Sequence, residues 1–244
     1  MREWGFLLRN TLRFSLPAWK RTVSLASLRG ELDAQRLSAL ERRFELSSWA
    51  RLCNAQDWRE SLYVLDVLTT HLPRSLPEGR ALDVGSKNGA YLPGLVTAVP
   101  RAWDAVELDA HRRYAWGSTR RVYGERMAAA FPGCRFIAGD VRTLDGPWAL
   151  VTWFLPFLTP EPLAAWGLPA RALAPEALLR HVVARLVPGG VLLVVNQGEH
   201  EAELQQALFD ELGLQPKVLG RIESPLSPFK KPRYGFMLRA SPRG

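Results

Sequence analysis

Residues 80–89, RALDVGSKNG, have the side-chain types and the spacing that could hold a ligand against the backbone. An apolar run interrupted by Asp83 predicts the end of a buried strand, since a core strand accepts such a charge only with a partner. Gly85 and Gly89 follow, and residues 90–99 have a composition compatible with a helix. A strand, a glycine-containing turn and a helix bring the backbone close to a ligand at the carboxyl edge of a parallel sheet. Glycine suits that turn because a Cβ would block the approach and because the turn can need a positive φ.

This turn differs from the common phosphate-binding loops. A P-loop ends in Gly-Lys-Ser or Gly-Lys-Thr, and the stretch has neither. A dinucleotide-binding fingerprint needs G-x-G-x-x-G, whereas here three residues separate Gly85 from Gly89 and Lys87 stands where a second glycine could be. A strand, turn and helix that bind nothing would have a similar pattern, so the interpretation depends on the residues that follow.

Two later acids fall at the ends of predicted strands. Glu107 lies near the end of the segment 103–108 (WDAVEL), eighteen positions after the second of these glycines. An acid at the end of the second strand can accept hydrogen bonds from both hydroxyls of a ribose, and charge-assisted bonds of this type contribute roughly 1.5–3 kcal/mol. Asp109 is the competing ribose ligand, or the cap of the next helix. Asp140 follows the third predicted strand, residues 134–138.

In this order, the glycine turn and the two acids resemble motif I and the following acidic positions of the class I S-adenosyl-L-methionine (SAM)-dependent methyltransferases. Motif I of that family usually has the pattern (D/E)-x-G-x-G-x-G, from which Lys87 departs. The resemblance implies SAM as the cofactor. It also implies the following cofactor-binding residues: Asp83, Gly85, Ser86, Gly89, Glu107, Asp140 and Val141.

The resemblance assigns expected roles to these residues. Asp83 would orient the loop or bind the methionine part of the cofactor, and the glycines would admit the cofactor. Glu107 would hold the ribose. Asp140 would accept a hydrogen bond from the adenine amino group, and the backbone N–H of Val141 would meet a ring nitrogen. In the absence of a ligand role, Asp140 would be a turn or cap residue.

The later part of the chain agrees with the same family. Residues 186–190 (LVPGG) match a Pro-Gly-Gly turn that is frequent there before the fifth strand, and residues 217–222 and 234–240 predict a terminal strand pair. The resemblance covers roughly residues 58–240. It implies a Rossmann-like α/β fold with a seven-stranded, mostly parallel sheet, a reversed terminal hairpin and helices on both faces.

We expect a SAM-binding methyltransferase domain at residues 58–244, preceded by an N-terminal helical extension at residues 1–57. Apolar residues at helical spacing, with arginines between them, predict a helix before Pro17. Such a basic amphipathic helix could lie on an anionic membrane or on RNA, although packing on its own domain is commoner. Further helical patterns cover residues 28–49 and 58–72. Four side chains of this region could cover the cofactor or fill the core: Trp49, Asn54, Trp58 and Tyr63.

Residues 148–154 (WALVTWF) predict the fourth strand, whose end faces the transferred methyl group in the family. The pocket mouth there would be mostly apolar and aromatic, formed by Thr152, Trp153, Phe154 and Pro156. The strand end carries no acid, no Asn/Asp-Pro-Pro-Tyr/Phe motif and no cysteine nucleophile, so no catalytic residue is identified. Glu199 or His200 could be a general base, although a cluster at a helix N-terminus is the commoner meaning.

The formal net charge of +8 and the pI near 10.0 favour an anionic partner such as nucleic acid. Residues 111–131 are predicted to form one helix, crowded with arginines and interleaved with Tyr114, Trp116 and Tyr123. That combination suits phosphate contacts and base stacking. A solvated helix face with its aromatic side chains turned inward explains the pattern almost as well.

The chain has two cysteines, Cys53 and Cys134, and four scattered histidines. These are too few for a disulfide framework, and their spacing predicts no metal site. A reducing compartment is therefore the expectation, and we predict a cytoplasmic protein. The sequence has no apolar run of about 18 residues, which a transmembrane span requires.

The resemblance implies a SAM-dependent methyltransferase. The sulfonium of the cofactor already activates the methyl group, so the enzyme mainly holds donor and acceptor in line, and positioning can supply about 7–11 kcal/mol of the barrier. The acceptor class is open among small molecules, RNA and proteins. Three alternatives stand beside this hypothesis: a non-catalytic nucleic-acid-binding protein on the same scaffold, an NAD-dependent oxidoreductase that uses Glu107, and a peripheral membrane enzyme.

Overall fold

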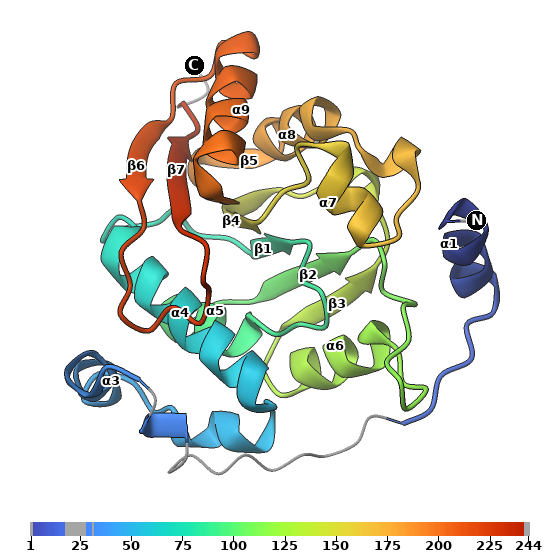
Figure 1. Cartoon of the computed structure of the whole chain (residues 1–244). Helices are drawn as coiled ribbons and strands as arrows, with labels where there is room; N and C mark the ends of the chain where they lie inside the picture. Colours follow the sequence, from blue (N-terminus) through green and yellow to red (C-terminus); the bar gives the residue numbers. More distant parts are fainter. Residues whose placement is uncertain (1, 18–27, 31, 242–244) are drawn as a thin grey trace.

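A computed structural model of the chain describes residues 2–17, 28–30 and 32–241 and contains one seven-stranded sheet in the order β3-β2-β1-β4-β5-β7-β6 (Figure 1). Its strands are β1 (Ala81–Val84), β2 (Trp103–Glu107), β3 (Arg135–Ala138), β4 (Trp148–Phe154), β5 (Leu186–Gln197), β6 (Lys217–Arg221) and β7 (Arg233–Arg239). The pairings from β3 to β5 are parallel, whereas β7 is antiparallel to both β5 and β6. This confirms the predicted α/β fold with a reversed terminal hairpin.

Helices cover both faces of the sheet. The α-helices are α1 (Arg2–Thr11), α3 (Ala34–Glu41), α4 (Ala55–His71), α5 (Leu92–Ala98), α6 (Arg120–Ala129), α7 (Pro160–Ala165), α8 (Pro175–Ala184) and α9 (Gly198–Glu211). Short 3-10 helices are η1 (Ser47–Arg51), η2 (Val141–Thr143) and η3 (Ala170–Ala172). Figure 1 shows α4, α5 and α6 on one side of the sheet, with α8 and α9 on the other.

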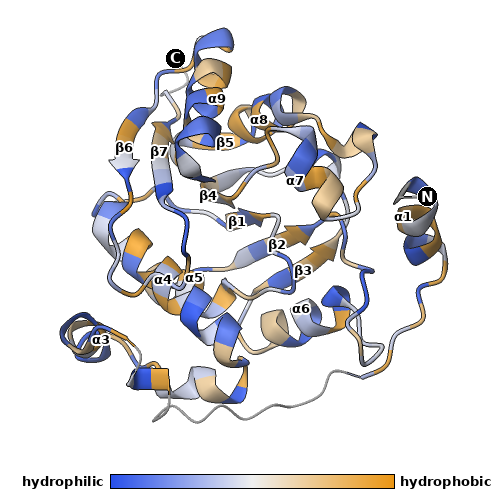
Figure 2. Cartoon of the chain, in the orientation of Figure 1, coloured by the Kyte–Doolittle hydropathy of each residue, from blue (hydrophilic) through white to orange (hydrophobic). Residues whose placement is uncertain are grey.

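The central strands are buried on both faces, which is typical of a parallel sheet covered by helices. Along β5, Val191, Leu193 and Val195 belong to the apolar cluster under α4 and α5. The alternate residues Leu192 and Val194 belong to the cluster under α8 and α9. Both sets are fully buried, so β5 reads as a continuous apolar run in the sequence. Figure 2 shows that hydrophilic residues occur mainly on the surrounding helices and loops.

The helix that precedes β1 begins earlier than the pattern predicts. Asn54 is its N-cap, because the Asn54 side chain accepts a hydrogen bond from the backbone N–H of Asp57. Trp49, Trp58 and Tyr63 are each 1% exposed and fill the core under this helix. Of the predicted N-terminal extension, residues 18–27 and 31 lie outside the described residues.

The prediction of one helix over residues 111–131 is wrong in its first half. Residues 111–119 form a loop closed by a β-bridge between Arg113 and Thr119. Gly117 has a φ of +86°, which glycine adopts readily, and the Thr119 side chain then accepts from Val122 N–H as the N-cap of α6. The sequence Gly-Ser-Thr therefore ends the loop and starts the helix.

The Pro-Gly-Gly segment also differs from the expectation. It lies inside β5 rather than in a turn before the strand: Leu186 pairs with Trp148, and the next pair joins Val191 to Leu150. The extra residues form a bulge in which Gly189 has a φ of +71°. In the described part of the chain, no helix combines the length and the apolar character that crossing a membrane demands.

Candidate functional site

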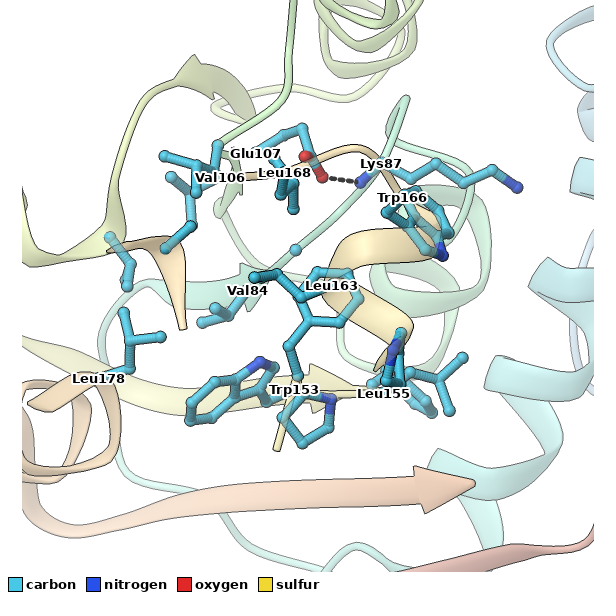
Figure 3. Close-up of a pocket in the computed structure, with 18 of the residues that line it drawn as sticks. Val84, Lys87, Val106, Glu107, Trp153, Leu155, Leu163, Trp166, Leu168 and Leu178 are labelled. Carbon is cyan, nitrogen blue, oxygen red and sulfur yellow. Dashed lines mark hydrogen bonds between the residues drawn. The ribbon is translucent and has the colours of Figure 1, made fainter. Parts of the chain in front are cut away.

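A cavity of about 410 Å³ opens at the carboxyl ends of the parallel strands. Residues from the loops after β1, β2 and β3 line one part of it, and residues from β4 and α7 line another (Figure 3). Predicted residues in its wall are Gly85, Glu107, Asp140, Val141, Trp153, Phe154 and Pro156. The parallel topology explains why these residues lie together, since the carboxyl ends of the strands that carry them lie at one edge of the sheet.

Gly85 is the point where the β1 loop meets the cavity. Its φ is +74° and an added Cβ would meet no atom within 4 Å, so the space beside its backbone is open. The N–H groups of Gly85 and Ser86 both donate to the carbonyl of Val106, at 2.9 and 3.0 Å. The end of β2 therefore holds the loop in place.

Two of the predicted loop residues do not line the cavity. Ser86 is fully buried and its hydroxyl lies 3.3 Å from the Val106 carbonyl oxygen. Gly89 has a φ of +73°, and a Cβ there would lie 3.2 Å from Cβ of Met127 on α6. Both residues shape the loop from behind, and a direct role for either with a cofactor stays a prediction.

Lys87, which departs from the motif, takes a conformation that usually favours glycine. Its φ is +58°, which is uncommon for a residue with a Cβ. Its backbone N–H donates to Oε2 of Glu107 at 2.7 Å. Its ammonium lies 3.4 Å from Oε1 of Glu60 on α4, and Figure 3 shows the side chain extending away from Glu107.

Glu107 is held rigidly at the end of β2. It is 7% exposed, accepts the Lys87 N–H on one oxygen and accepts the Asp109 N–H on the other at 2.8 Å. The Arg120 guanidinium lies 3.5 Å away. Burial raises the pKa of Glu107, and Arg120 and the two N–H groups oppose that shift. The side chain is thus positioned before any ligand arrives.

Asp140 is the N-cap of η2, and its carboxylate already has a partner. It accepts hydrogen bonds from the backbone N–H of Arg142 at 2.9 Å and from the Arg142 guanidinium at 2.6 Å. Burial opposes ionisation of Asp140, but the hydrogen bonds from Arg142 outweigh it and lower its pKa. Val141 is buried beside it. The adenine role of these residues stays a prediction.

Asp83 lies beneath the loop and is absent from the cavity wall. It is 1% exposed, and its Oδ1 accepts the Thr152 hydroxyl proton at 2.8 Å. Its other oxygen has no hydrogen-bond partner among the described residues. Burial raises its pKa to about 7, against the Thr152 hydrogen bond that lowers it. The geometry fits the predicted loop-orienting role better than direct ligand contact.

The wall also contains residues that the motifs do not mark. Leu108 is one of them: it directly follows Glu107 and lines the cavity, as the predicted residue Val141 does after Asp140. An apolar side chain thus stands beside each carboxylate. Leu163, Trp166 and Leu168, from α7 and the segment after it, line the opposite part of the cavity (Figure 3). A signal existed for α7, since a proline- and alanine-rich insertion follows β4.

The structure does not place Glu199 or His200, the two candidates for a general base, in the cavity wall. Glu199 and His200 are exposed in the first turn of α9 and do not line the cavity, whereas Gln197 and Glu201 do. The commoner meaning, a helix N-terminal cluster, therefore describes Glu199 and His200. Arg233, at the start of β7, also lines the cavity, and no sequence motif marks it.

Most arginines of the predicted phosphate-binding stretch have partners within the chain. Arg112 pairs with Asp109 at 2.5 Å, Arg121 with Glu125 at 2.6 Å, and Arg120 lies between Glu107 and Asp109. Tyr114 and Trp116 stack on each other with ring centroids 5.0 Å apart. Asp109 is fully buried and lies outside the cavity wall, so its competing role as ribose ligand stays a prediction. The cap of α6 is Thr119 and not Asp109.

No protein-family model matches the sequence, and no curated protein matches it. Solved structures do match the fold. A methyltransferase from Pyrococcus furiosus has a TM-score of 0.51 and 14% identity, with 74% of this chain and 83% of that chain covered. A proposed SAM-dependent methyltransferase from Methanococcus maripaludis has a TM-score of 0.52 and 13% identity, with coverage of 75% and 86%.

A third similar structure is a proposed RNA methyltransferase from Pyrococcus horikoshii, with a TM-score of 0.50, 15% identity and coverage of 74% and 83%. At these identities the likeness concerns the fold. The strand order with an antiparallel β7 between β5 and β6 agrees with it. The chain therefore has the fold of the class I SAM-dependent methyltransferases.

Proposed function

We propose that this protein transfers the methyl group of SAM to an acceptor. The observation that carries the proposal is that Gly85, Glu107 and Asp140 line the same cavity as the apolar end of β4. The carboxylates of Glu107 and Asp140 thus lie in the wall of one cavity, next to the open backbone turn at Gly85. The reversed terminal hairpin supports this proposal over an NAD-dependent oxidoreductase, whose fold does not end in that way.

The wall of the cavity fits a nucleoside-bearing cofactor. The open space beside Gly85 would accept the atoms that a Cβ would displace. Leu108 and Val141 would pack on a planar base while the acids beside them accept its hydrogen-bond donors. The volume of about 410 Å³ lies in the range of about 300–1,000 Å³ for small-molecule sites.

SAM, when bound, supplies a methyl group that its sulfonium already activates. Glu107 would accept hydrogen bonds from the ribose hydroxyls, and Asp140 would accept one from the adenine amino group. Trp153, Phe154 and Pro156 would exclude water and pack on the acceptor. Residues 153–157 contain no ionisable side chain, so the proposal rests on positioning, which can supply about 7–11 kcal/mol of the barrier.

The test is calorimetric titration of SAM into the wild type and the Glu107→Ala variant. We expect Glu107→Ala to weaken SAM binding by roughly tenfold or more, because charge-assisted bonds of roughly 1.5–3 kcal/mol would be lost. Equal binding by the two proteins, or no binding to either, would contradict the proposal.

Asp104→Asn is the matched control for stability. Asp104 is also a buried acid on the same strand, but it pairs with Arg80 and Arg135 and lies outside the cavity wall. Asp104→Asn should lower thermal stability and leave SAM affinity within about twofold of wild type. This comparison separates the loss of a ligand contact from a general loss of folding.

The acceptor needs a separate experiment. One similar structure is a proposed RNA methyltransferase, and this supports RNA as one acceptor to include beside proteins and small molecules. A tritiated-methyl transfer assay on cell extract, fractionated into these three classes, would identify it. A nucleic-acid-binding protein without activity would instead bind RNA with a steep salt dependence and transfer no label.

A second candidate function, peripheral association with an anionic membrane, is favoured by the surface of α1. Trp4, Leu8 and Leu12 are 78%, 59% and 55% exposed and lie at helical spacing. Arg9, on another side of the helix, is held by Asp109 at 3.0 Å. Residues 1–21 contain five basic residues and one acid, a composition that suits anionic lipids.

Vesicle flotation tests this candidate with the full chain and with a chain that lacks residues 1–16. The full chain should float with vesicles that contain phosphatidylglycerol and should remain in the bottom fraction when the vesicles contain phosphatidylcholine alone. The truncated chain should remain in the bottom fraction with both kinds of vesicle. The Val218→Glu variant, which alters an exposed apolar residue on β6, should float like wild type. Equal flotation of truncated and full chains would exclude α1 as the membrane contact.

A further inference from the structure

Arg233 is a buried arginine in the wall of the cavity. It is the first residue of β7 and pairs with Gln197 at the end of β5, so it lies at the same sheet edge as the β1 loop. It is 5% exposed and lines the cavity together with Gln197, Glu201 and Phe229. Its position therefore places a cation at the end of the cavity formed by β5 and β7.

The described contacts of the Arg233 guanidinium are with neutral groups. Nη1 donates to Oε1 of Gln197 and to the Lys231 carbonyl, each at 3.2 Å. Its central carbon lies 4.2 Å from the centroid of the Phe229 ring, in a cation–π contact. Among the described residues, no carboxylate oxygen approaches it within 4.0 Å.

The two carboxylates whose charge acts on Arg233, those of Glu201 and Glu60, have other partners. Glu201 accepts the backbone N–H of Gln197 at 2.9 Å. Glu60 accepts from Gln56 at 2.7 Å and has the Lys87 ammonium at 3.4 Å. Burial lowers the pKa of Arg233, and Tyr63, Tyr91 and these two carboxylates only partly oppose that shift. The two carboxylates influence Arg233 across space without contacting it.

The other buried arginine provides the contrast. Arg120 is also 5% exposed, but its guanidinium lies 3.5 Å from Glu107 and 3.6 Å from Asp109. A buried cation without a contacting anion is costly to maintain, and a guanidinium offers a planar fork of donors that matches a carboxylate or phosphate. Arg233 thus has the chemistry of an anion receptor whose anion is supplied by a ligand.

We propose that Arg233 forms an anion-binding subsite at the β5–β7 end of the cavity and holds a carboxylate or phosphate group of a bound molecule. The proposal rests on the function proposed above and deepens it. Two sources of the anion fit the position: the α-carboxylate of the cofactor, and an acidic group on the acceptor. The first makes Arg233 a cofactor-binding residue, and the second makes the acceptor an anionic small molecule or an acidic group on a larger one.

Titrations with SAM and with 5′-methylthioadenosine distinguish the cofactor source, because the second compound lacks the amino-acid part. The proteins are the wild type, Arg233→Gln and Arg233→Lys. If the subsite holds the cofactor, Arg233→Gln should weaken SAM roughly tenfold or more and leave methylthioadenosine unchanged. Arg233→Lys, which keeps the charge without the fork, should recover part of the loss.

Planar anions test the acceptor source. Benzoate and phenyl phosphate, with neutral benzyl alcohol for comparison, are added to the free protein and to protein saturated with S-adenosylhomocysteine, and binding is followed by ligand-observed NMR. If the subsite serves the acceptor, wild type should bind the anions in preference to the alcohol in both forms. Arg233→Gln should lose that preference while its SAM affinity stays at the wild-type value.

Arg221→Gln is the matched control, since Arg221 lies on the neighbouring strand β6, is exposed and pairs with Glu223. It should behave like wild type in both experiments. If Arg233→Gln changes neither the SAM-to-methylthioadenosine ratio nor the anion preference, the subsite is excluded. If wild type binds neither nucleoside, the methyltransferase proposal fails, while the anion experiment on the free protein still reports on Arg233.

Discussion

Three acids predicted from one sequence pattern have three different environments. Asp83 is enclosed beneath the loop with one hydrogen-bond donor. Glu107 receives two backbone N–H groups and faces Arg120, and Asp140 is paired with Arg142 near the surface. Burial disfavours the carboxylate at all three positions, and hydrogen bonds and nearby cations oppose it. Burial wins at Asp83 and Glu107, whose pKa values are raised, and Arg142 wins at the less buried Asp140, whose pKa is lowered. The residue type alone therefore does not set the charge state.

The raised pKa of Asp83 predicts a pH-dependent stability. The pKa is about 7 in the folded protein against an ordinary value of 3.8. Between these values the folded protein keeps a proton that the unfolded chain has lost, so the free energy of unfolding falls as pH rises. The slope is at most about 1.4 kcal/mol per pH unit. Below the window both states are protonated, and above it both are ionised.

Urea unfolding of wild type and Asp83→Asn across this window measures the effect. Asparagine cannot ionise, so the stability of Asp83→Asn relative to wild type should increase as pH rises from about 4 to about 7 and then level off. Asp57, whose pKa burial also raises, to about 6, is present in both proteins and cancels in the comparison. A constant difference between the two curves would show that Asp83 does not titrate in this range.

At the scale of elements, close contacts explain several glycines that have no ligand. In α5, a Cβ at Gly94 would lie 2.3 Å from the Ser61 carbonyl oxygen on α4. In α6, a Cβ at Gly124 would lie 2.2 Å from the Phe136 ring on β3. These distances are far below van der Waals contact, so both glycines set how closely the elements pack. Helical propensity alone would favour alanine there.

The elements also differ in how they are attached. α4 and α5 contribute many residues to one apolar cluster. The described side chains of α1 include none of the core residues, and α1 is held by polar contacts, such as Arg9 with Asp109 and Glu3 with Arg171. The Glu3–Arg171 pair is exposed, and exposed pairs contribute little to stability. We infer that the core depends on α4 and α5 and much less on α1.

For the whole molecule, this difference predicts the outcome of two truncations. Removing residues 1–17 should leave a cooperative thermal transition within a few degrees of wild type, because Asp109 keeps Arg112 and Arg120. Removing residues 1–57 should abolish the cooperative transition. That cut passes through the first turn of α4 and deletes core side chains, among them Leu37, Leu40, Leu46 and Trp49.

The free energy lost with these core side chains supports the expected unfolding of the chain that lacks residues 1–57. Loss of one buried large apolar side chain costs about 2–5 kcal/mol, and several such losses exceed a total stability of about 5–15 kcal/mol. Circular dichroism melts of the two truncated chains, with the full chain as control, provide the measurement. A cooperative transition in the chain that begins at residue 58 would support the predicted boundary as a true domain boundary.

Several features could be predicted from the sequence because they depend on local chemistry. The long apolar run of β5 and the glycines after β1 are visible as patterns, and the order of Asp83, Glu107 and Asp140 along the chain resembles that of a family whose fold has a parallel sheet with loops at one edge. The helix predicted over residues 111–119 is wrong because arginines and aromatic residues suit a helix as well as a loop. The loop depends on the positive φ of Gly117 and on the bridge between Arg113 and Thr119, which only the structure shows.

The sequence by itself determined the fold class, through the resemblance of its motifs to a known family, and two of the acids in the cavity wall, Glu107 and Asp140. These signals lie in strand ends and turns, which are short segments of the chain. Only the tertiary structure decided which charges are neutralised. Arg120 and Arg233 are both buried arginines, yet one faces two carboxylates and the other faces neutral oxygens. Arg233 meets Gln197 only when β7 pairs with β5, and Arg120 meets Glu107 and Asp109 only when the loop after β2 folds back. Residue spacing therefore carries no record of which charge is left for a ligand.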